Sequence, residues 1–164
     1  MKLEEVPSGS RILIDANILI YARRGMSLES RRFLARCAAG DLRGVLTTTC
    51  LAEFCHRRMI QEAQSKGLAG SNPARALAGR PDIVQSLTEY QKDMDELLAG
   101  DFEVLTVTAA LIRDSLRLQR SHGLLTNDSN MLAAAFAAGI NTMATSDPQF
   151  ETVSELQVFR PQDI

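Results

Sequence analysis

The sequence predicts an α/β protein with a mostly parallel sheet and helices on both faces. Short apolar runs rich in β-branched residues alternate along the chain with longer segments of helical periodicity. Such alternation favours right-handed crossovers between parallel strands. A length of 164 residues, with 45% hydrophobic and 23% charged residues, indicates a single domain over residues 1–164 with one core.

The first half of the chain supplies two strands and two helices. The run 12–14, Ile-Leu-Ile, lacks polar alternation, which suits a strand covered on both faces. A helix is predicted from Ser27, as its cap, to Gly40, as its stop. Residues 44–48 predict the second strand, and a long helix follows it as far as Gly67.

The segment 67–81 is dense in glycine and proline, including Gly67, Gly70, Pro73 and Pro81. This density predicts a loop excursion rather than a packed element. The loop could be a lid over a site or a surface insertion without a chemical role. Helical periodicity resumes at residues 83–97 and ends at Gly100.

The last third repeats the alternation of strand and helix. It predicts strands at 102–107, 142–145 and 156–159, and helices at 109–121 and 126–139. In a parallel sheet with such crossovers, ligands bind at the carboxyl ends of the strands, near the point where strand order reverses. Side chains at the ends of the predicted strands are therefore the candidates for a functional site.

The composition excludes some classes of nucleic-acid binder. With 18 Lys and Arg against 20 Asp and Glu, the net charge is −2, which disfavours binding through a basic surface alone. The absence of Trp and the presence of only two Tyr disfavour a stacking platform for bases. Seven arginines early in the chain could form a local positive rim around an acidic centre, or lie on solvated helix faces: Arg23, Arg24, Arg31, Arg32, Arg36, Arg57 and Arg58.

The three cysteines, Cys37, Cys50 and Cys55, lie in apolar surroundings and are odd in number, which indicates reduced, buried thiols. Cys50, Cys55 and His56 lack a second pair with zinc-ligand spacing. The N-terminus has no signal-peptide pattern, and no apolar run approaches the roughly 18 residues of a membrane span. These features predict a soluble, cytoplasmic protein.

Four acids follow or flank the predicted strands: Asp15, Glu53, Asp128 and Asp147. Each alone is explained as a turn or helix-terminus residue, and Asn17 as a turn residue beside Asp15. If the sheet brings all four to one edge, their mutual repulsion favours a hard divalent cation, Mg²⁺ or Mn²⁺. Such an ion can orient a phosphodiester and lower the pKa of a bound water. No Ser, His or Cys triad, Walker loop or dinucleotide fingerprint offers another chemistry.

The segments that carry these acids resemble the acidic motifs of PIN domains, in the same order. They are Ile-Leu-Ile-Asp-Ala-Asn at 12–17, Thr-Thr-Cys-Leu-Ala-Glu at 48–53, Leu-Leu-Thr-Asn-Asp at 124–128, and Met-Ala-Thr-Ser-Asp-Pro-Gln-Phe at 143–150. The resemblance covers nearly the whole chain and is closest to VapC-type toxins of bacterial and archaeal toxin–antitoxin pairs.

The resemblance implies a three-layer PIN-like fold with a five-stranded sheet, and a Mg²⁺- or Mn²⁺-dependent endoribonuclease. It implies an RNA substrate (tRNA, rRNA or mRNA), a cognate antitoxin and a homodimer. The residues that match catalytic and metal-binding acids are Asp15, Glu53, Asp128 and Asp147, and those that match supporting polar residues are Asn17 and Thr145. Two departures are Gln149, where the family often has another acid, and the long segment 67–81.

Three alternatives remain open. The first is a catalytically silent PIN-like module that binds proteins, and the second is an RNA-processing PIN nuclease that is not a toxin. The third, a haloacid-dehalogenase-like phosphatase, requires a second aspartate where this chain has Asn17. Helices near Phe33 and Phe54 could form a groove for a partner, or face the core.

Overall fold

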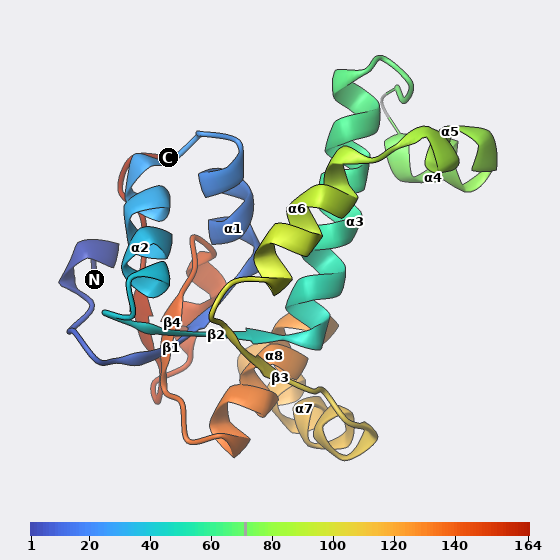
Figure 1. The fold of residues 1–164 in the computed structure, drawn as a ribbon. Coiled ribbons are helices and arrows are strands. Elements are labelled where there is room, and N and C mark those ends of the chain that lie inside the picture. The colour runs from blue at the N-terminus through green and yellow to red at the C-terminus, as the bar shows by residue number, and fades with distance from the viewer. Residues whose placement is uncertain (71) are drawn as a thin grey trace. The chain divides into compact units, whose positions relative to one another are not determined.

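The computed structural model describes residues 1–70 and 72–164, which form two compact units (Figure 1). The first unit contains Met1–Leu51 and Asp101–Ile164, and the second contains Ala52–Gly100. The first unit holds the sheet and the second is helical.

The sheet of the first unit has five parallel strands in the order β3-β2-β1-β4-β5, so the predicted fold class is confirmed. The strands are β1 (Arg11–Ile14), β2 (Arg43–Thr47), β3 (Glu103–Leu105), β4 (Thr142–Ala144) and β5 (Gln157–Phe159). Because β2 and β4 flank β1 on opposite sides, strand order reverses at β1. The carboxyl ends of β1 and β4 therefore border the crevice where ligands bind in such sheets.

Helices cover both faces of the sheet in the first unit. Figure 1 shows α1 (Ala16–Arg23) and α2 (Leu28–Ala38) on one side, and α7 (Ala109–His122) and α8 (Thr126–Ala137) on the other. Two short 3₁₀ helices, η1 (Leu3–Glu5) and η2 (Pro148–Thr152), complete the unit. The strand predicted at 12–14 is fully buried, as its continuous apolar run requires.

The second unit contains most of α3 (Thr48–Ser65), and also α4 (Pro73–Ala78), α5 (Pro81–Ser86) and α6 (Glu89–Leu98). The prediction of a loop over 67–81 is wrong for the part that forms α4. Pro73 and Pro81 each stand at the start of a short helix, where a missing N–H has no cost. Four side chains form the small core: Ala63, Leu77, Ile83 and Leu87. Ser71 of the predicted loop lies outside the described residues.

Glu62 of α3 is buried and holds the start of α6. Its carboxylate accepts hydrogen bonds from the backbone N–H of Thr88 at 2.9 Å and of Tyr90 at 3.0 Å, and forms an ion pair with Lys66. Burial alone would raise the pKa of Glu62, but the Lys66 and backbone hydrogen bonds outweigh it and lower the pKa to about 2. This capping explains why the predicted helix over 83–97 is two helices, α5 and α6.

The remaining sequence expectations concern thiols and membranes. All three cysteines are free thiols, with Cys37 and Cys50 buried and Cys55 half-buried. Burial raises the pKa of Cys37 to about 11, so its thiol stays protonated at neutral pH. Among the helices of the described residues, none combines the length and apolar character needed to cross a membrane.

Candidate active site at the ends of strands β1 and β4

Asp15 leaves β1 and begins α1 as its N-cap. The Asp15 carboxylate is 6% exposed and accepts hydrogen bonds from Asn17 Nδ2 at 2.6 Å and from the Asn17 backbone N–H at 3.4 Å. The Thr145 hydroxyl donates a third hydrogen bond to Asp15 Oδ2, at 2.6 Å. These donors fix the carboxylate at the end of the central strand, where a buried charge needs such partners.

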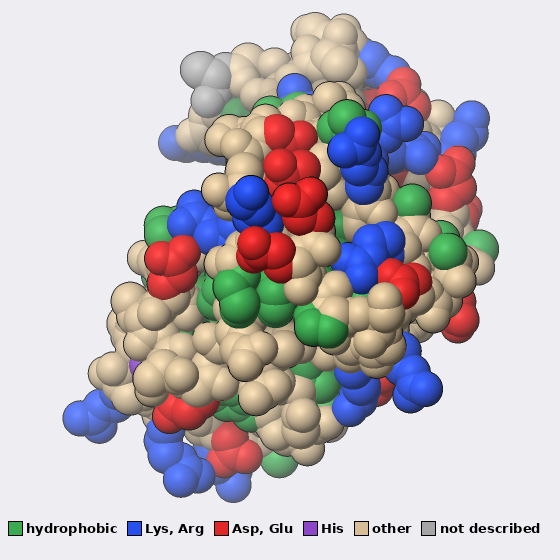
Figure 2. Space-filling model, turned by 90° about the vertical axis from the view of Figure 1, so that its left-hand side faces the viewer, with side chains coloured by type: hydrophobic (Ala, Val, Ile, Leu, Met, Phe, Trp, Pro, Cys, Tyr) green, Lys and Arg blue, Asp and Glu red, His purple; other side chains and the backbone are tan. Residues whose placement is uncertain are grey.

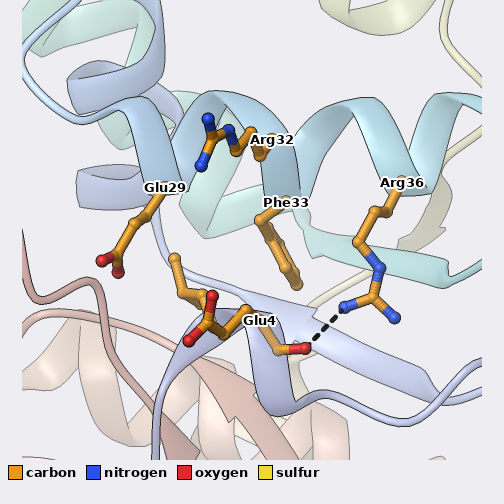
Figure 3. A pocket seen from close by; sticks show the side chains of 6 residues that line it. Glu4, Glu29, Arg32, Phe33 and Arg36 are labelled. Atoms are coloured by element: carbon orange, nitrogen blue, oxygen red, sulfur yellow. Dashed lines mark hydrogen bonds between the residues drawn. The ribbon is translucent and has the colours of Figure 1, made fainter.

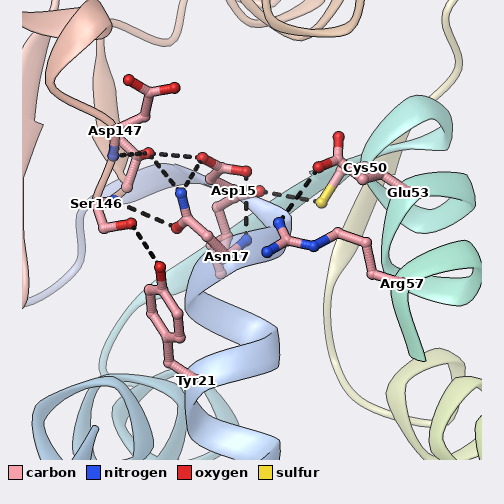
Figure 4. A network of polar contacts seen from close by, with 10 residues as sticks. Asp15, Asn17, Tyr21, Cys50, Glu53, Arg57, Ser146 and Asp147 are labelled. Carbon is pink, nitrogen blue, oxygen red and sulfur yellow. Dashed lines mark hydrogen bonds and ion pairs between the residues drawn. The ribbon is translucent and has the colours of Figure 1, made fainter. Parts of the chain in front are cut away.

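Thr145 and Asn17 join the ends of β1 and β4 through hydrogen bonds. Figure 4 shows the contacts of Asn17 with Asp15 and Ser146. Besides donating to Asp15, Thr145 Oγ1 accepts a hydrogen bond from the Asp147 backbone N–H at 3.0 Å and lies 3.2 Å from Asn17 Nδ2. Asn17 Oδ1 accepts from the Ser146 N–H at 3.3 Å. One network of polar contacts therefore holds the two strand ends together at the reversal of strand order.

Asp147 follows β4 and caps η2. Its Oδ1 accepts a hydrogen bond from the Gln149 N–H at 2.8 Å, as in the turn expected before Pro148. In Figure 4 the Asp147 carboxylate points away from Asp15, while its backbone N–H faces Thr145. The side chain is half-buried, so its second oxygen is within reach of a ligand from solvent.

Asp128 and Glu53 do not occupy the helix-terminal positions that the sequence predicted for them. Asp128 is the third residue of α8, whose N-cap is Leu125, so its interpretation as an N-cap is wrong. Glu53 is the sixth residue of α3, and the first turn of α3 contains no acid, so the helix-terminus explanation fails for Glu53 as well. Glu53 belongs to the second unit and forms an ion pair with Arg57, at 3.4 Å.

A divalent cation such as Mg²⁺ needs several oxygen donors gathered around one point. Among residues 1–70 and 72–164, no three side chains of His, Cys, Asp or Glu gather as closely as a metal ion requires. The chemistry of the donors nevertheless fits, because Asp15, Asp128 and Asp147 offer the carboxylate oxygens that Mg²⁺ and Mn²⁺ bind.

Two residues that the sequence did not single out support the segment that carries Asp147. The Tyr21 hydroxyl lies 3.3 Å from Ser146 Oγ, and Arg160 donates to the Ser146 carbonyl at 3.0 Å. Tyr21 stands four residues after Asn17, on the same face of α1. That spacing was the available signal for Tyr21, whereas Arg160 lies beyond the matched motifs and offered none.

The early arginines could form a rim or lie on solvated helix faces, and ion pairs hold Arg36, Arg57 and Arg58. Arg36 pairs with Asp41 and Arg58 with Asp93, each at 2.6 Å, and Arg57 pairs with Glu53. Figure 2 shows acidic and basic side chains interspersed on one face of the molecule, without one continuous basic patch there. Local pairing therefore accounts for these three arginines better than a rim.

A pocket of about 210 Å³ lies between η1 and α2 (Figure 3). Phe33 lines it but is only 2% exposed, and Phe54 is 3% exposed, so the expectation that these rings face the core is confirmed. Arg36 donates to the Glu4 carbonyl beside the pocket, at 3.5 Å. None of the four acids singled out in the sequence lines this pocket, which separates it from the network around Asp15.

Comparison with known proteins identifies the fold. A model of the PIN domain family matches residues 12–156. The structure is similar to VapBC2 from Rickettsia felis bound to a promoter DNA fragment (17% identity, TM-score 0.57, covering 93% of this chain and 99% of that one). It is also similar to VapC20 from Mycobacterium tuberculosis, described as a toxin that cleaves the sarcin-ricin loop (16% identity, TM-score 0.55, covering 89% of this chain and 98% of that one). A third similar structure is FitAcB from Neisseria gonorrhoeae (19% identity, TM-score 0.54, covering 93% of this chain and 99% of that one). No protein with a curated description matches significantly.

Proposed function

Because the chain belongs to the PIN-domain family, we propose that it is a metal-dependent endoribonuclease whose active site is built on the ends of β1 and β4. The observation that carries this proposal is the network of Asp15, Asn17 and Thr145 at the reversal of strand order. A buried, fixed carboxylate at that position is what binding of a cation and a phosphodiester would require.

Each residue has a role in this proposal. Asp15, Asp128, Asp147 and Glu53 are the proposed ligands of Mg²⁺ or Mn²⁺, and Asn17 and Thr145 orient Asp15. When bound, such an ion lowers the pKa of a water and polarises the phosphodiester. The Thr145 hydroxyl orients Asp15 by donating a hydrogen bond to its Oδ2 at 2.6 Å. The proposed product is cleaved RNA.

We further propose that the protein is the toxin of a toxin–antitoxin pair that acts on cytoplasmic RNA, with a cognate antitoxin that covers the site and a homodimeric assembly. The support is likeness of fold: one similar structure is described as a toxin–antitoxin complex from Klebsiella pneumoniae, and VapC20 is described as a toxin, each at 16% identity. The main alternative is an RNA-processing PIN nuclease that carries the same acids. Copurification of a small partner protein that suppresses cleavage would favour the toxin.

The test is cleavage of a tRNA and ribosomal RNA pool with Mg²⁺, with Mn²⁺ and with EDTA. Asp15→Asn is suited to it because asparagine also caps helices, so α1 should survive while the charge is lost. We expect metal-dependent cleavage by the wild type and loss of at least about 100-fold in Asp15→Asn, the scale of removing a group that stabilises charge in the transition state.

The matched control is Asp41→Asn, an aspartate that pairs with Arg36 and contacts no member of the Asp15 network in the described residues. It should cut at the wild-type rate. If the folded wild type and both variants cut no RNA under any metal, the protein-binding module replaces the nuclease.

A further inference from the structure

Two adjacent arginines on α3 are held in different ways. Arg58 donates from Nε to Asp93 at 2.6 Å and from Nη1 to Gln61 at 2.9 Å, and its side chain is 13% exposed. Arg57 is 39% exposed and contacts Glu53 through Nη1 alone, at 3.4 Å. Arg58 is therefore a mostly enclosed structural residue with two side-chain partners, whereas Arg57 is more exposed and makes one long contact.

The contact between Arg57 and Glu53 is long enough for either side chain to exchange it for a different partner. Charge-assisted N–H···O bonds are usually about 2.7–2.9 Å long, and strong arginine–carboxylate pairs use two parallel bonds. This pair has one, at 3.4 Å, and the described part of the chain gives Arg57 no second carboxylate within ion-pair distance. The other guanidinium N–H groups of Arg57 therefore remain available to a second acceptor.

The position of Arg57 on α3 determines what that acceptor could be. Residues four apart lie on the same face of a helix, one turn from each other, so a group bound by Glu53 is within reach of the Arg57 side chain. The planar guanidinium fork matches two oxygens of a phosphate. A divalent cation, in turn, competes with the guanidinium for the Glu53 carboxylate.

We propose that Arg57, one helical turn from Glu53 on α3, binds a phosphate of the RNA. It neutralises Glu53 while no cation is bound, and it binds a non-bridging oxygen of an RNA phosphate once Glu53 binds the cation. This inference rests on the proposed function, because it takes Glu53 as a metal ligand. It has two consequences: removing Arg57 weakens RNA binding, and it strengthens cation binding in the absence of RNA.

The first measurement is the affinity of the full chain for a fluorescein-labelled single-stranded RNA over a range of KCl concentrations. Ca²⁺ replaces Mg²⁺, and a gel verifies that the RNA stays intact. Arg57→Gln should weaken binding about tenfold, the effect of one hydrogen bond to a charged group. It should also reduce the slope of log K against log salt by about 0.7, which corresponds to one lost phosphate contact. Arg57→Lys should keep the slope and lose part of the affinity.

The matched control is Arg117→Gln on α7, an exposed arginine that pairs with Asp114 at 3.1 Å. It removes the same charge and should leave the slope and the affinity unchanged. If Arg117→Gln lowers the slope as much as Arg57→Gln does, or if Arg57→Gln binds RNA as the wild type does, the proposal is refuted.

The second measurement is Mn²⁺ binding without RNA, by titration calorimetry. Arg57→Gln should bind Mn²⁺ more tightly than the wild type, because a competing cation is gone, and Glu53→Gln should bind it more weakly. Weaker Mn²⁺ binding by Arg57→Gln would contradict the proposal that the cation replaces Arg57 as the partner of Glu53. Failure of the wild type to cut RNA would refute the proposed function, whereas wild-type cleavage with unaltered RNA binding by a folded Arg57→Gln would refute this inference alone.

Discussion

Thr145 uses one hydroxyl for three contacts, to Asp15, Asn17 and the backbone N–H of Asp147. Thr145→Val keeps the shape of the side chain but leaves a buried Asp15 oxygen with one donor fewer. We expect a loss of about 1–3 kcal/mol in the free energy of unfolding, the cost of an unsatisfied buried polar group. We also expect lower kcat for RNA, because Asp15 is less well fixed.

Thr145→Ser keeps the hydroxyl and removes the methyl group, so it tests the two groups separately. It should restore most of the cleavage rate of the wild type, while its stability measured by urea unfolding stays slightly lower. Equal loss of cleavage in Thr145→Val and Thr145→Ser would contradict a role for the hydroxyl, because only Thr145→Val lacks the hydroxyl and its hydrogen bonds.

At this scale the sequence predicted which residues to examine but not how they contact. Asp15, Asn17 and Thr145 were identified from motifs, and the structure joins them across 128 to 130 residues of chain. The predicted helix-terminal positions of Asp128 and Glu53 were wrong, because local capping rules do not determine the first residue of a helix. Asp93 carried no local signal, because its partner Arg58 lies 35 residues away. The spacing of Glu62 to Lys66 gave no sign of the hydrogen bonds that Glu62 accepts from the start of α6.

Among the elements, α6 depends on Glu62 for its N-terminus. Because the pKa of Glu62 falls from 4.5 to about 2 on folding, its stabilisation is fully present above pH 4.5 and is lost as the pH falls towards 2. The shift corresponds to on the order of 3 kcal/mol at neutral pH. Glu62→Gln should therefore be less stable by about that amount at pH 7, and its unfolding should depend less on pH between 5 and 2.

Glu89→Gln is the matched control for this prediction. Glu89 pairs with the same Lys66, at 3.3 Å, but its side chain is 54% exposed. Exposed pairs contribute about 0–1 kcal/mol, so Glu89→Gln should change the unfolding curve little. If both variants lose the same stability, Lys66 rather than the capped backbone of α6 is the stabilising partner.

Helix α2 is capped by Ser27, which also contacts the C-terminal segment. Ser27 Oγ accepts from the Ser30 N–H at 2.9 Å and donates to Asp163 at 2.6 Å. Ser27→Ala should cost about 1–2 kcal/mol in thermal or urea unfolding. Thr108→Ala on α7 removes an exposed cap with a longer bond, 3.4 Å, and should cost less. A larger loss in Thr108→Ala would contradict this ranking.

Sequence patterns were sufficient to predict most of the helices and strands. All five strands and helices α2, α3, α7 and α8 were predicted, because continuous apolar runs and helical periodicity suit a sheet covered on both faces. Helix α1 was missed although Asp15 is its N-cap, because the helix follows β1 directly, with no loop to mark its start. Helix α4 was taken as loop because Pro73 was interpreted as a breaker, although proline at the first helical position starts a helix.

For the whole molecule, the division into two compact units raises the question of how cooperatively they unfold. The second unit has a core cluster of four buried side chains, whereas the first has a five-stranded sheet between two helical layers. Regions with few buried apolar contacts open first in hydrogen exchange. We therefore expect amides of α4 and α5 to exchange before those of β1 and β4.

Glu62→Gln tests whether this difference reflects separate unfolding. If the second unit opens on its own, the variant should speed exchange within residues 52–100 by on the order of 100-fold, the equivalent of about 3 kcal/mol, and leave β1 and β4 unchanged. If instead the variant speeds exchange in β1 as much as in α6, the chain unfolds as the single domain that its length predicted, and Glu62 stabilises all of it. Exchange followed by mass spectrometry in both proteins distinguishes the two outcomes, because only separate unfolding confines the effect of one buried carboxylate to its own unit.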